Sequence, residues 1–359
     1  MSLLDWWRGS GRHSVSVPAM DGALKPNDLV EQASVLAEAD GADNLACARG
    51  ALWFSSGSQL LRIALPHAGR PAERAEDFGR DILAVASDGG DALAVAFDDG
   101  ILISGGRHDG RRIAGIDGRL QAATTSCMFE TPDVVLLCLG SQRHPASRWK
   151  HDLLSHEASG SVWRVDIATG TYERLAERLA FPAGIARTAA GEILVAEAWR
   201  HRVIELSTGR PVLDDLPFYP GRMAVGANGE ILLSGFAPRR QMVEFILREP
   251  EFCKRMTTEI AEDHWMAPSL SSGKDFLEPL QGGEIKHHGI LKPWAPTKSY
   301  GLVVRFDRTG RIVNSMHSRA GGRRHGITAA LEQDGHVIMT SKGSGAVLAA
   351  AMVSGGING

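Results

Sequence analysis

The sequence predicts an all-β fold, a six-bladed β-propeller, on the strength of three observations. Apolar strand-like runs recur along the chain, Gly-bearing turns join them, and no helical pattern separates most of the units. The recurrence has a period of roughly 40 residues, which matches the ~40 to 50 residues of a four-stranded propeller blade. Radial repetition also leaves few exposed strand edges. A sandwich or a barrel is the alternative, and both fit this period less well.

Three copies of the repeat are clear. The clearest has apolar runs at residues 184–186, 193–196 and 202–206. The other two turn at Asn228-Gly229 and at Asp334-Gly335, and such pairs supply the positive φ that tight hairpins need. Three weaker copies begin near Asn44, Ile82 and Thr124. Together they make six units, with long insertions in the third and fifth.

Residues 238 to 300 do not follow this repeat of strands and turns. Between residues 241 and 262 the apolar positions recur mostly every three or four residues, which predicts an amphipathic helix interrupted near Pro250. The loop that follows is long, and long loops in compact domains often cover a binding site. We therefore expect an N-terminal extension at 1–21, a propeller at 22–352 with residues 238–300 as an insertion over one face, and a flexible tail at 353–359.

Composition excludes several classes of function. Apolar residues make up 43% and charged residues 23%, values typical of a soluble protein with a large core. A net charge of −3 gives no general attraction to nucleic acid or to an anionic membrane. The four cysteines form no C-x-x-C pair, so neither a zinc site nor a disulfide scaffold is indicated. Asp5 and Arg8 interrupt the N-terminus before a long apolar run develops, so we expect a cytoplasmic protein with no membrane span.

Several short motifs, in order along the chain, resemble strictosidine synthase-like proteins. The matching motifs are GALKPN at 22–27, GADNLA at 41–46, SRWKHDLL at 147–154, GSVWRVD at 160–166, LAFPAGI at 179–185, LVAE at 194–197, LPFYPGR at 216–222 and EQDG at 332–335. The resemblance extends to the wider superfamily of gluconolactonases, regucalcin and paraoxonases. It implies a six-bladed propeller with its functional site at the mouth of the central channel.

The resemblance also implies a place for a metal, which this sequence does not preserve. Metal-dependent relatives hold a divalent cation with a carboxylate near the chain start and with Asn and Asp side chains of later blades. Here the matching positions are Asp43, Thr124, Ala183 and Gly221-Arg222. Hard cations need several oxygen ligands, so a divalent metal such as calcium is disfavoured and no other cofactor is implied. As a hypothesis, Arg222 places a guanidinium where relatives place the metal and pairs with Asp43; the alternative is a surface arginine.

Two further positions bear on the reaction. Strictosidine synthase uses a glutamate in its last blade, where this sequence has Thr328, and a hydroxyl is a poor substitute for a carboxylate base. His325 precedes the same blade and is the candidate general base, because a neutral imidazole can take a proton from water near pH 7. The alternative for His325 is a structural role among local backbone groups.

The remaining candidates would line the substrate site. They are Trp149 and His151 in the third unit and the pair His287-His288 in the insertion. Glu197 either faces the channel or forms salt bridges with Arg200 or Arg202, and the structural role is the favoured one.

These residues favour an enzyme that hydrolyses a small lactone or ester. Water activated by His325 would attack a substrate held by Arg222 under the insertion. A carbon–nitrogen bond-forming or lyase-type enzyme and a non-catalytic propeller that binds a small ligand are the alternatives. No G-x-S-x-G elbow, P-loop or dinucleotide fingerprint is present, so serine hydrolase, nucleotide and nicotinamide chemistry are poorly supported.

Overall fold

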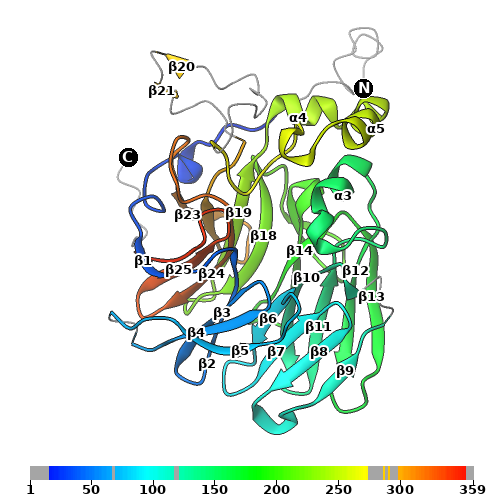
Figure 1. The fold of residues 1–359 in the computed structure, drawn as a ribbon, viewed down its shortest axis with the longest axis vertical. Coiled ribbons are helices and arrows are strands. Elements are labelled where there is room, and N and C mark those ends of the chain that lie inside the picture. Colours follow the sequence, from blue (N-terminus) through cyan, green and yellow to red (C-terminus); the bar gives the residue numbers. More distant parts are fainter. Residues whose placement is uncertain are drawn as a thin grey trace.

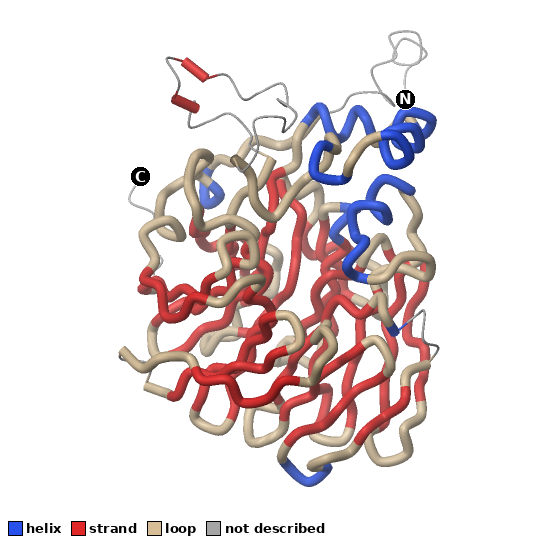
Figure 2. The backbone as a smooth tube through the Cα atoms, viewed as in Figure 1, coloured by secondary structure: helices blue, strands red, loops and turns tan. Residues whose placement is uncertain are grey.

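The described part of the computed structural model forms a six-bladed β-propeller, as the sequence predicts (Figure 1). The structure describes residues 16–66, 69–116, 121–273, 286–287, 290–291 and 298–352. Over these ranges there are six four-stranded antiparallel sheets. The predicted tail at 353–359 and most of the predicted N-terminal extension lie outside them. Figure 2 shows that strands build the body of the molecule and that most of the helices gather at one end.

The first three blades follow the chain in simple order. Blade one contains β2 (Ala42–Ala48), β3 (Ala51–Ser56), β4 (Gln59–Ala64) and β5 (Glu73–Asp77). Blade two contains β6 (Ala84–Ser87), β7 (Leu93–Phe97), β8 (Gly100–Ser104) and β9 (Arg112–Ala114). Blade three contains β10 (Thr124–Thr131), β11 (Val134–Leu139), β12 (Gly160–Asp166) and β13 (Tyr172–Leu179).

The last three blades carry the insertion and the closure of the ring. Blade four contains β14 (Pro182–Arg187), β15 (Ile193–Glu197), β16 (Arg202–Glu205) and β17 (Pro211–Leu213). Blade five contains β18 (Phe218–Val225), β19 (Ile231–Pro238), β22 (Leu302–Phe306) and β23 (Ile312–His317). Blade six contains β24 (Ile327–Gln333), β25 (His336–Ser341), β26 (Ala346–Ala351) and, from the start of the chain, β1 (Ser34–Glu38).

The first strand of each of these blades lies nearest the central channel. β2, β6, β10, β14, β18 and β24 contact one another in turn around the ring. The ring closes where β1 pairs antiparallel with β26, with Ser34 opposite Ala349. Small and branched side chains fill the space between neighbouring sheets; Ala94 and Ala96 of blade two, for example, pack with Val135 and Leu137 of blade three. Such interdigitation excludes water and accounts for most of the stability of a propeller.

The turn chemistry and the insertion agree with the sequence predictions. Gly229 and Asp334 adopt left-handed backbone angles in the hairpins of blades five and six, with φ of 76° and 49°. Between β19 and β22 lie α4 (Gln241–Ile246), α5 (Pro250–Glu259), β20 (Lys286–His287) and β21 (Ile290–Leu291). Pro250 occupies the first turn of α5, where a missing N–H costs nothing, so the predicted helix is broken at the predicted place.

Helices cover one end of the propeller. α3 (Trp149–Ser155) connects β11 to β12 and packs against α5 through Leu153, Cys253 and Met256. Short 3₁₀ turns complete the described elements: η1 (Gly22–Leu24), η2 (Gly106–His108), η3 (Ala146–Arg148), η4 (Ala198–Arg200) and η5 (Glu262–His264). We call α3, α4, α5 and residues 260–273 the cap. None of the helices in the described ranges has the length and apolar character needed to cross a lipid bilayer.

Candidate functional site

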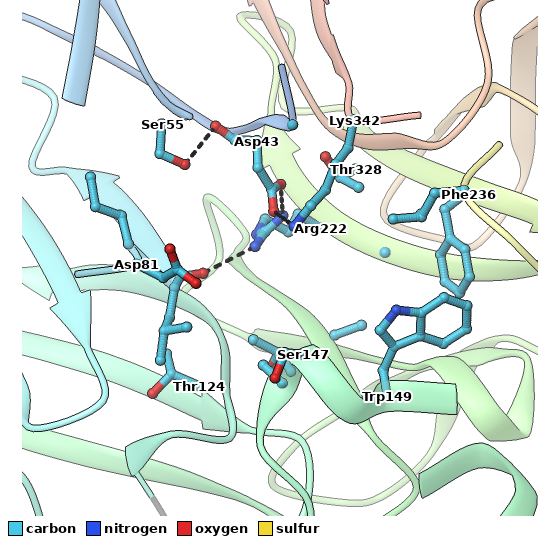
Figure 3. Close-up of a pocket in the computed structure, with 18 of the residues that line it drawn as sticks. Asp43, Ser55, Asp81, Thr124, Ser147, Trp149, Arg222, Phe236, Thr328 and Lys342 are labelled. Atoms are coloured by element: carbon cyan, nitrogen blue, oxygen red, sulfur yellow. Dashed lines mark hydrogen bonds and ion pairs between the residues drawn. The ribbon is translucent and has the colours of Figure 1, made fainter. Parts of the chain in front are cut away.

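A cavity of about 550 Å³ lies at the capped end of the central channel (Figure 3). Each blade contributes at least one residue from its first strand or from the position just before it, namely Asp43, Leu83, Thr124, Ala183, Arg222 and Thr328. Leu270 of the cap lines it as well. A cavity of this volume is suited to a small organic ligand.

The backbone of β2 directs Asp43 into the cavity. Asn44 has a left-handed φ of 52°, which asparagine tolerates better than most residues, and the pairing of β2 with β3 is irregular between Asp43 and Ala46. The Asn44 backbone N–H donates to Oδ1 of Asp43 at 2.8 Å, and its side-chain amide donates to Ser55 Oγ at 2.9 Å. This bulge fixes the direction of the Asp43 carboxylate.

Two cations share that carboxylate. Arg222 donates from Nη1 to Oδ1 of Asp43 at 2.6 Å and from Nη2 to the Leu83 carbonyl at 3.3 Å. Lys342 donates from Nζ to Oδ2 of Asp43 at 2.8 Å (Figure 3). The ion pair between Asp43 and Arg222 that the sequence predicts is therefore present, and Lys342 adds a second cation that it does not predict.

The partners of Asp43 decide its charge. Burial alone would raise the pKa of the Asp43 carboxyl, but Arg222 and then Lys342 outweigh it and hold this pKa well below the usual range. Asp43 is therefore a carboxylate at any physiological pH and a weak base. Its chemical role is to hold two cations at one side of the cavity.

These residues do not fit a divalent metal on the channel axis. A guanidinium and an ammonium already occupy the two oxygens of Asp43, and the other matching positions are Thr124 and Ala183. Over the residues that the structure describes, no three His, Cys, Asp or Glu side chains are grouped to hold a metal ion. A hard cation such as Ca²⁺ takes about six to eight oxygen ligands, whereas Asp43 is already paired, Thr124 adds one hydroxyl and Ala183 adds no polar side-chain atom.

Aromatic side chains form the opposite side of the cavity. Phe181 stacks on Trp199 with ring centroids 4.4 Å apart, and Trp149 meets Phe236 edge to face at 5.5 Å. We call Trp149, Phe181, Trp199 and Phe236 the aromatic wall. Figure 3 shows Trp149 and Phe236 together, away from the group formed by Asp43, Arg222 and Lys342.

A buried carboxylate outside the cavity holds part of this wall. The indole N–H of Trp199 donates to Oδ2 of Asp152, a residue of α3 that is 1% exposed. Burial raises the pKa of the Asp152 carboxyl, and hydrogen bonds from Ser141 and Trp199 offset this only in part. The polar atom of Trp199 is thus engaged by a residue outside the cavity lining.

Asp81 adds an exposed carboxylate to the cavity lining, next to Leu83 (Figure 3). Within the described ranges its carboxylate forms no hydrogen bond and no ion pair. A carboxylate without protein partners can accept a proton from water, which Asp43 cannot readily do.

His325 does not line the cavity, so the prediction that it shares a cavity with Asp43 and Arg222 is wrong. Its side chain is buried, Nε2 faces the Arg319 carbonyl at 2.9 Å, and Nδ1 faces Ser299 Oγ at 2.7 Å. A ring that donates from Nε2 must accept at Nδ1, so both nitrogens are engaged. Burial also lowers the pKa of His325. His325 therefore fastens the end of the insertion to blade six. This is the structural role that the sequence offers as the alternative to a general base.

The other predicted residues divide into two groups. Trp149, Thr124, Ala183 and Thr328 line the cavity. His151 does not, because its ring packs edge to face on Trp265 of the cap at 4.6 Å.

Glu197 also lies outside the cavity lining. It is fully buried, forms ion pairs with Arg200 and Arg202, and accepts a hydrogen bond from the Ala180 N–H at 2.8 Å. These contacts agree with the structural role that the sequence favours. The side chain of His287 and the whole of His288 lie outside the described residues.

Sequence reasoning missed Lys342, Asp81 and three residues of the aromatic wall. One sequence feature could have identified Lys342. It directly follows β25, the second strand of the last blade, in a turn rich in Ser and Gly, and this turn lies at the end of the channel that holds Asp43. Phe181 and Phe236 are apolar and carried no signal that separates them from core residues.

Comparisons with known proteins agree with this architecture. The model of the strictosidine synthase family matches residues 128–208. Regucalcin from Agrobacterium tumefaciens is similar in structure, with a TM-score of 0.54 and 12% identity over 89% of this chain and 92% of that one. A gluconolactonase from Xanthomonas campestris has a TM-score of 0.53 and 13% identity over 94% and 95%. A luciferin-regenerating enzyme has a TM-score of 0.53 and 9% identity over 91% and 95%. No curated protein matches the sequence.

The chain is a six-bladed β-propeller with a strictosidine synthase-like segment. At these identities the solved structures show the fold and leave the activity open. The strictosidine synthase-like segment runs from β10 to just beyond β16 and contains Trp149, Phe181 and Trp199. It contains none of Asp43, Arg222 and Lys342. The charged side of the cavity therefore lies wholly outside the matched segment.

Proposed function

We propose that this propeller hydrolyses a small neutral lactone or ester in the cavity and needs no resident metal to do so. The observation that carries the proposal is the convergence of Arg222 and Lys342 on Asp43 inside a cavity that is otherwise largely apolar. Fixed positive groups in such a place stabilise negative charge as it develops on a substrate.

The two cations would act on the carbonyl oxygen. An ammonium group has three N–H donors, so Lys342 keeps two after its bond to Asp43. The Arg222 guanidinium lies on the same carboxylate, and its Nη2 makes only a long bond of 3.3 Å to the Leu83 carbonyl. Because Asp43 holds both groups in place beforehand, little reorganisation is needed when the carbonyl oxygen becomes an oxyanion.

Asp81 would activate the water. Its carboxylate takes a proton from water while the water oxygen attacks the carbonyl carbon, and a tetrahedral oxyanion forms beside Arg222 and Lys342. The carbon–oxygen bond to the leaving alcohol then breaks, and Asp81 returns the proton to that alcohol. The products are a carboxylic acid and an alcohol, which a lactone keeps in one open chain.

Support from relatives is limited to architecture. The similar structure from Xanthomonas campestris is a gluconolactonase, so the same fold can host lactone hydrolysis. Thr328, at the position of the strictosidine synthase glutamate, lines the cavity, and its Oγ1 lies 3.2 Å from Oγ1 of Thr340. It offers no carboxylate for the carbon–nitrogen bond-forming alternative.

The test is hydrolysis of phenyl acetate and δ-valerolactone in a pH-stat, with and without EDTA. We expect turnover that survives EDTA and falls by roughly 10²- to 10³-fold in Lys342→Met, as for loss of one oxyanion donor. Asp81→Asn should lose roughly 10²-fold or more. Lys254→Met is the matched control, since Lys254 is exposed on α5 away from the cavity.

Two results would overturn the proposal. One is a Lys342→Met protein that turns over within twofold of the unaltered protein. The other is activity that EDTA abolishes and Ca²⁺ restores. Saturable binding of these compounds with no turnover would identify a ligand-binding propeller instead.

A further inference from the structure

From the two sides of the cavity, we infer that its substrate has an apolar body, as in an aryl- or alkyl-substituted lactone or ester, and is not a polyhydroxylated sugar lactone. This inference rests on the proposed function, because it names the substrate class of the same site. It separates this chain from the gluconolactonase that shares its fold.

The aromatic wall offers a ligand surface with few hydrogen-bonding groups. Phe181 and Phe236 have no polar side-chain atom, and Ala183 and Leu270, which adjoin the wall in the cavity, have none either. The indole N–H of Trp199 is taken by Asp152 at 2.8 Å. The Trp149 nitrogen faces the cavity in Figure 3 and can serve one acceptor.

The wall is built to keep its shape. Trp199 is held between Phe181, which stacks on it, and Asp152, which accepts its N–H. Trp149 begins α3, and this helix packs on α5 through Leu153 and Met256. A rigid apolar surface favours a ligand of fixed shape, because neither partner loses much conformational freedom on binding.

A sugar lactone does not match such a surface. It carries hydroxyl groups around its whole ring, and the polar lining residues can bond only some of them; each hydroxyl that faces the aromatic wall loses its hydrogen bonds to water. The strong donors of this cavity, Lys342 and Arg222, meet at one place around Asp43 and can serve the carbonyl group. An aryl or alkyl body, in contrast, gains from leaving water and from contact with aromatic rings.

Binding of two matched amides tests the preference without any turnover. We would titrate the full-length protein with 3-phenylpropionamide and with gluconamide by calorimetry. Both present the same neutral carbonyl group, and only their bodies differ. We expect 3-phenylpropionamide to bind roughly tenfold tighter or more, the scale at which a pocket discriminates apolar groups. Equal binding, or tighter binding of gluconamide, would overturn the inference.

Variants locate the preference on the wall. Phe236→Ala should weaken the binding of 3-phenylpropionamide roughly tenfold and change the binding of gluconamide little. Phe245→Ala is the matched control, because Phe245 lies on α4, is 53% exposed and does not line the cavity. Because Phe236→Ala could impair folding, its melting curve is compared with that of the unaltered protein, and Phe236→Leu serves as a milder second variant that should weaken binding of 3-phenylpropionamide roughly threefold and leave binding of gluconamide unchanged. Unchanged binding of 3-phenylpropionamide by a folded Phe236→Ala protein would contradict the assignment.

Measurements of turnover distinguish a failure of this inference from a failure of the proposed hydrolase function. If 3-phenylpropionamide binds preferentially and no ester or lactone is hydrolysed, the ligand preference stands and the hydrolase proposal fails. If glucono-δ-lactone is hydrolysed faster than a phenyl-substituted δ-lactone, the hydrolase proposal stands and the substrate class is wrong.

Discussion

The two sides of the cavity each depend on a buried carboxylate, and the two carboxylates have opposite surroundings. Asp43 lies on β2 between Arg222 and Lys342, and these cations hold its pKa well below the usual range. Asp152 lies on α3 behind the aromatic wall, where burial raises its pKa and neutral donors offset this only in part. Similar burial thus leads to opposite pKa shifts, because charged partners outweigh desolvation and neutral donors do not.

This contrast gives the two carboxylates opposite effects on stability as the pH changes. Asp43 has a lowered pKa in the folded state, so its stabilising effect is present above the ordinary carboxyl pKa of about 3.9 and is lost as the pH falls below it. Asp152 has a raised pKa, so its ionisation opposes folding. The contribution of Asp152 to the free energy of unfolding is therefore highest at low pH and declines as the pH rises from about 3.9 through the raised pKa of the folded state.

The largest expected effect is that of Asp43→Ala. Removing the carboxylate leaves Arg222 and Lys342 without their partner, which should lower the free energy of unfolding at pH 7 by about 3 to 5 kcal/mol. Urea denaturation measures this, and the difference from the unaltered protein should shrink below about pH 4. The exposed Asp98 provides the control variant, Asp98→Ala. A loss below about 1 kcal/mol, the range of a surface ion pair, would show that the three charges are not coupled.

A smaller effect is expected for Trp199→Phe. The phenyl ring keeps the aromatic surface and removes the N–H that Asp152 accepts, so the buried carboxylate loses a donor and stability at pH 7 should fall by about 1 to 3 kcal/mol. Trp149→Phe is the control, because no hydrogen bond joins the Trp149 indole to Asp152 in the described residues. The same substitution of Trp199 made in an Asp152→Asn protein should cost clearly less; an equal cost would mean that packing alone explains the loss.

The smallest effect, and one of opposite sign, is expected for Asp152→Asn. The amide oxygen still accepts the Trp199 N–H, while the unfavourable buried charge is gone, so stability at pH 7 should rise by about 1 kcal/mol. Denaturation curves should converge with those of the unaltered protein below about pH 3, where the carboxyl is neutral in both states. A decrease at pH 7 would show that the negative charge of Asp152 is itself stabilising.

The sequence predicts the fold well because the signals for a propeller are local and repeated. Hairpin turns such as Asn228-Gly229 require particular backbone angles, and Pro250 marks a helix break wherever the helix is placed. Each signal can be read without knowing its neighbours in space. Six repeats of the same unit then leave few architectures that bury all of their apolar faces.

The site was harder to predict because the direction of a side chain at a strand end depends on its surroundings. Asp43 and Arg222 could be paired because the resemblance to strictosidine synthase-like proteins implied that both positions face the channel. His325 and Lys342 lie on adjacent segments of blade six, yet only Lys342 reaches the cavity, while hydrogen bonds to Ser299 and Arg319 hold His325 away from it. Those partners come from the end of the insertion and from the segment that follows β23, and no local pattern connects them to His325.

The closure of the ring has a consequence for biosynthesis. Asp43 and Lys342 are 299 positions apart, and β1 pairs with β26, the last strand of the described blades. A nascent chain that has not yet released blade six from the ribosome therefore carries an unpaired β1, and its Asp43 has Arg222 as a partner but not yet Lys342. The cavity would therefore be completed only in the step that closes the ring between β1 and β26.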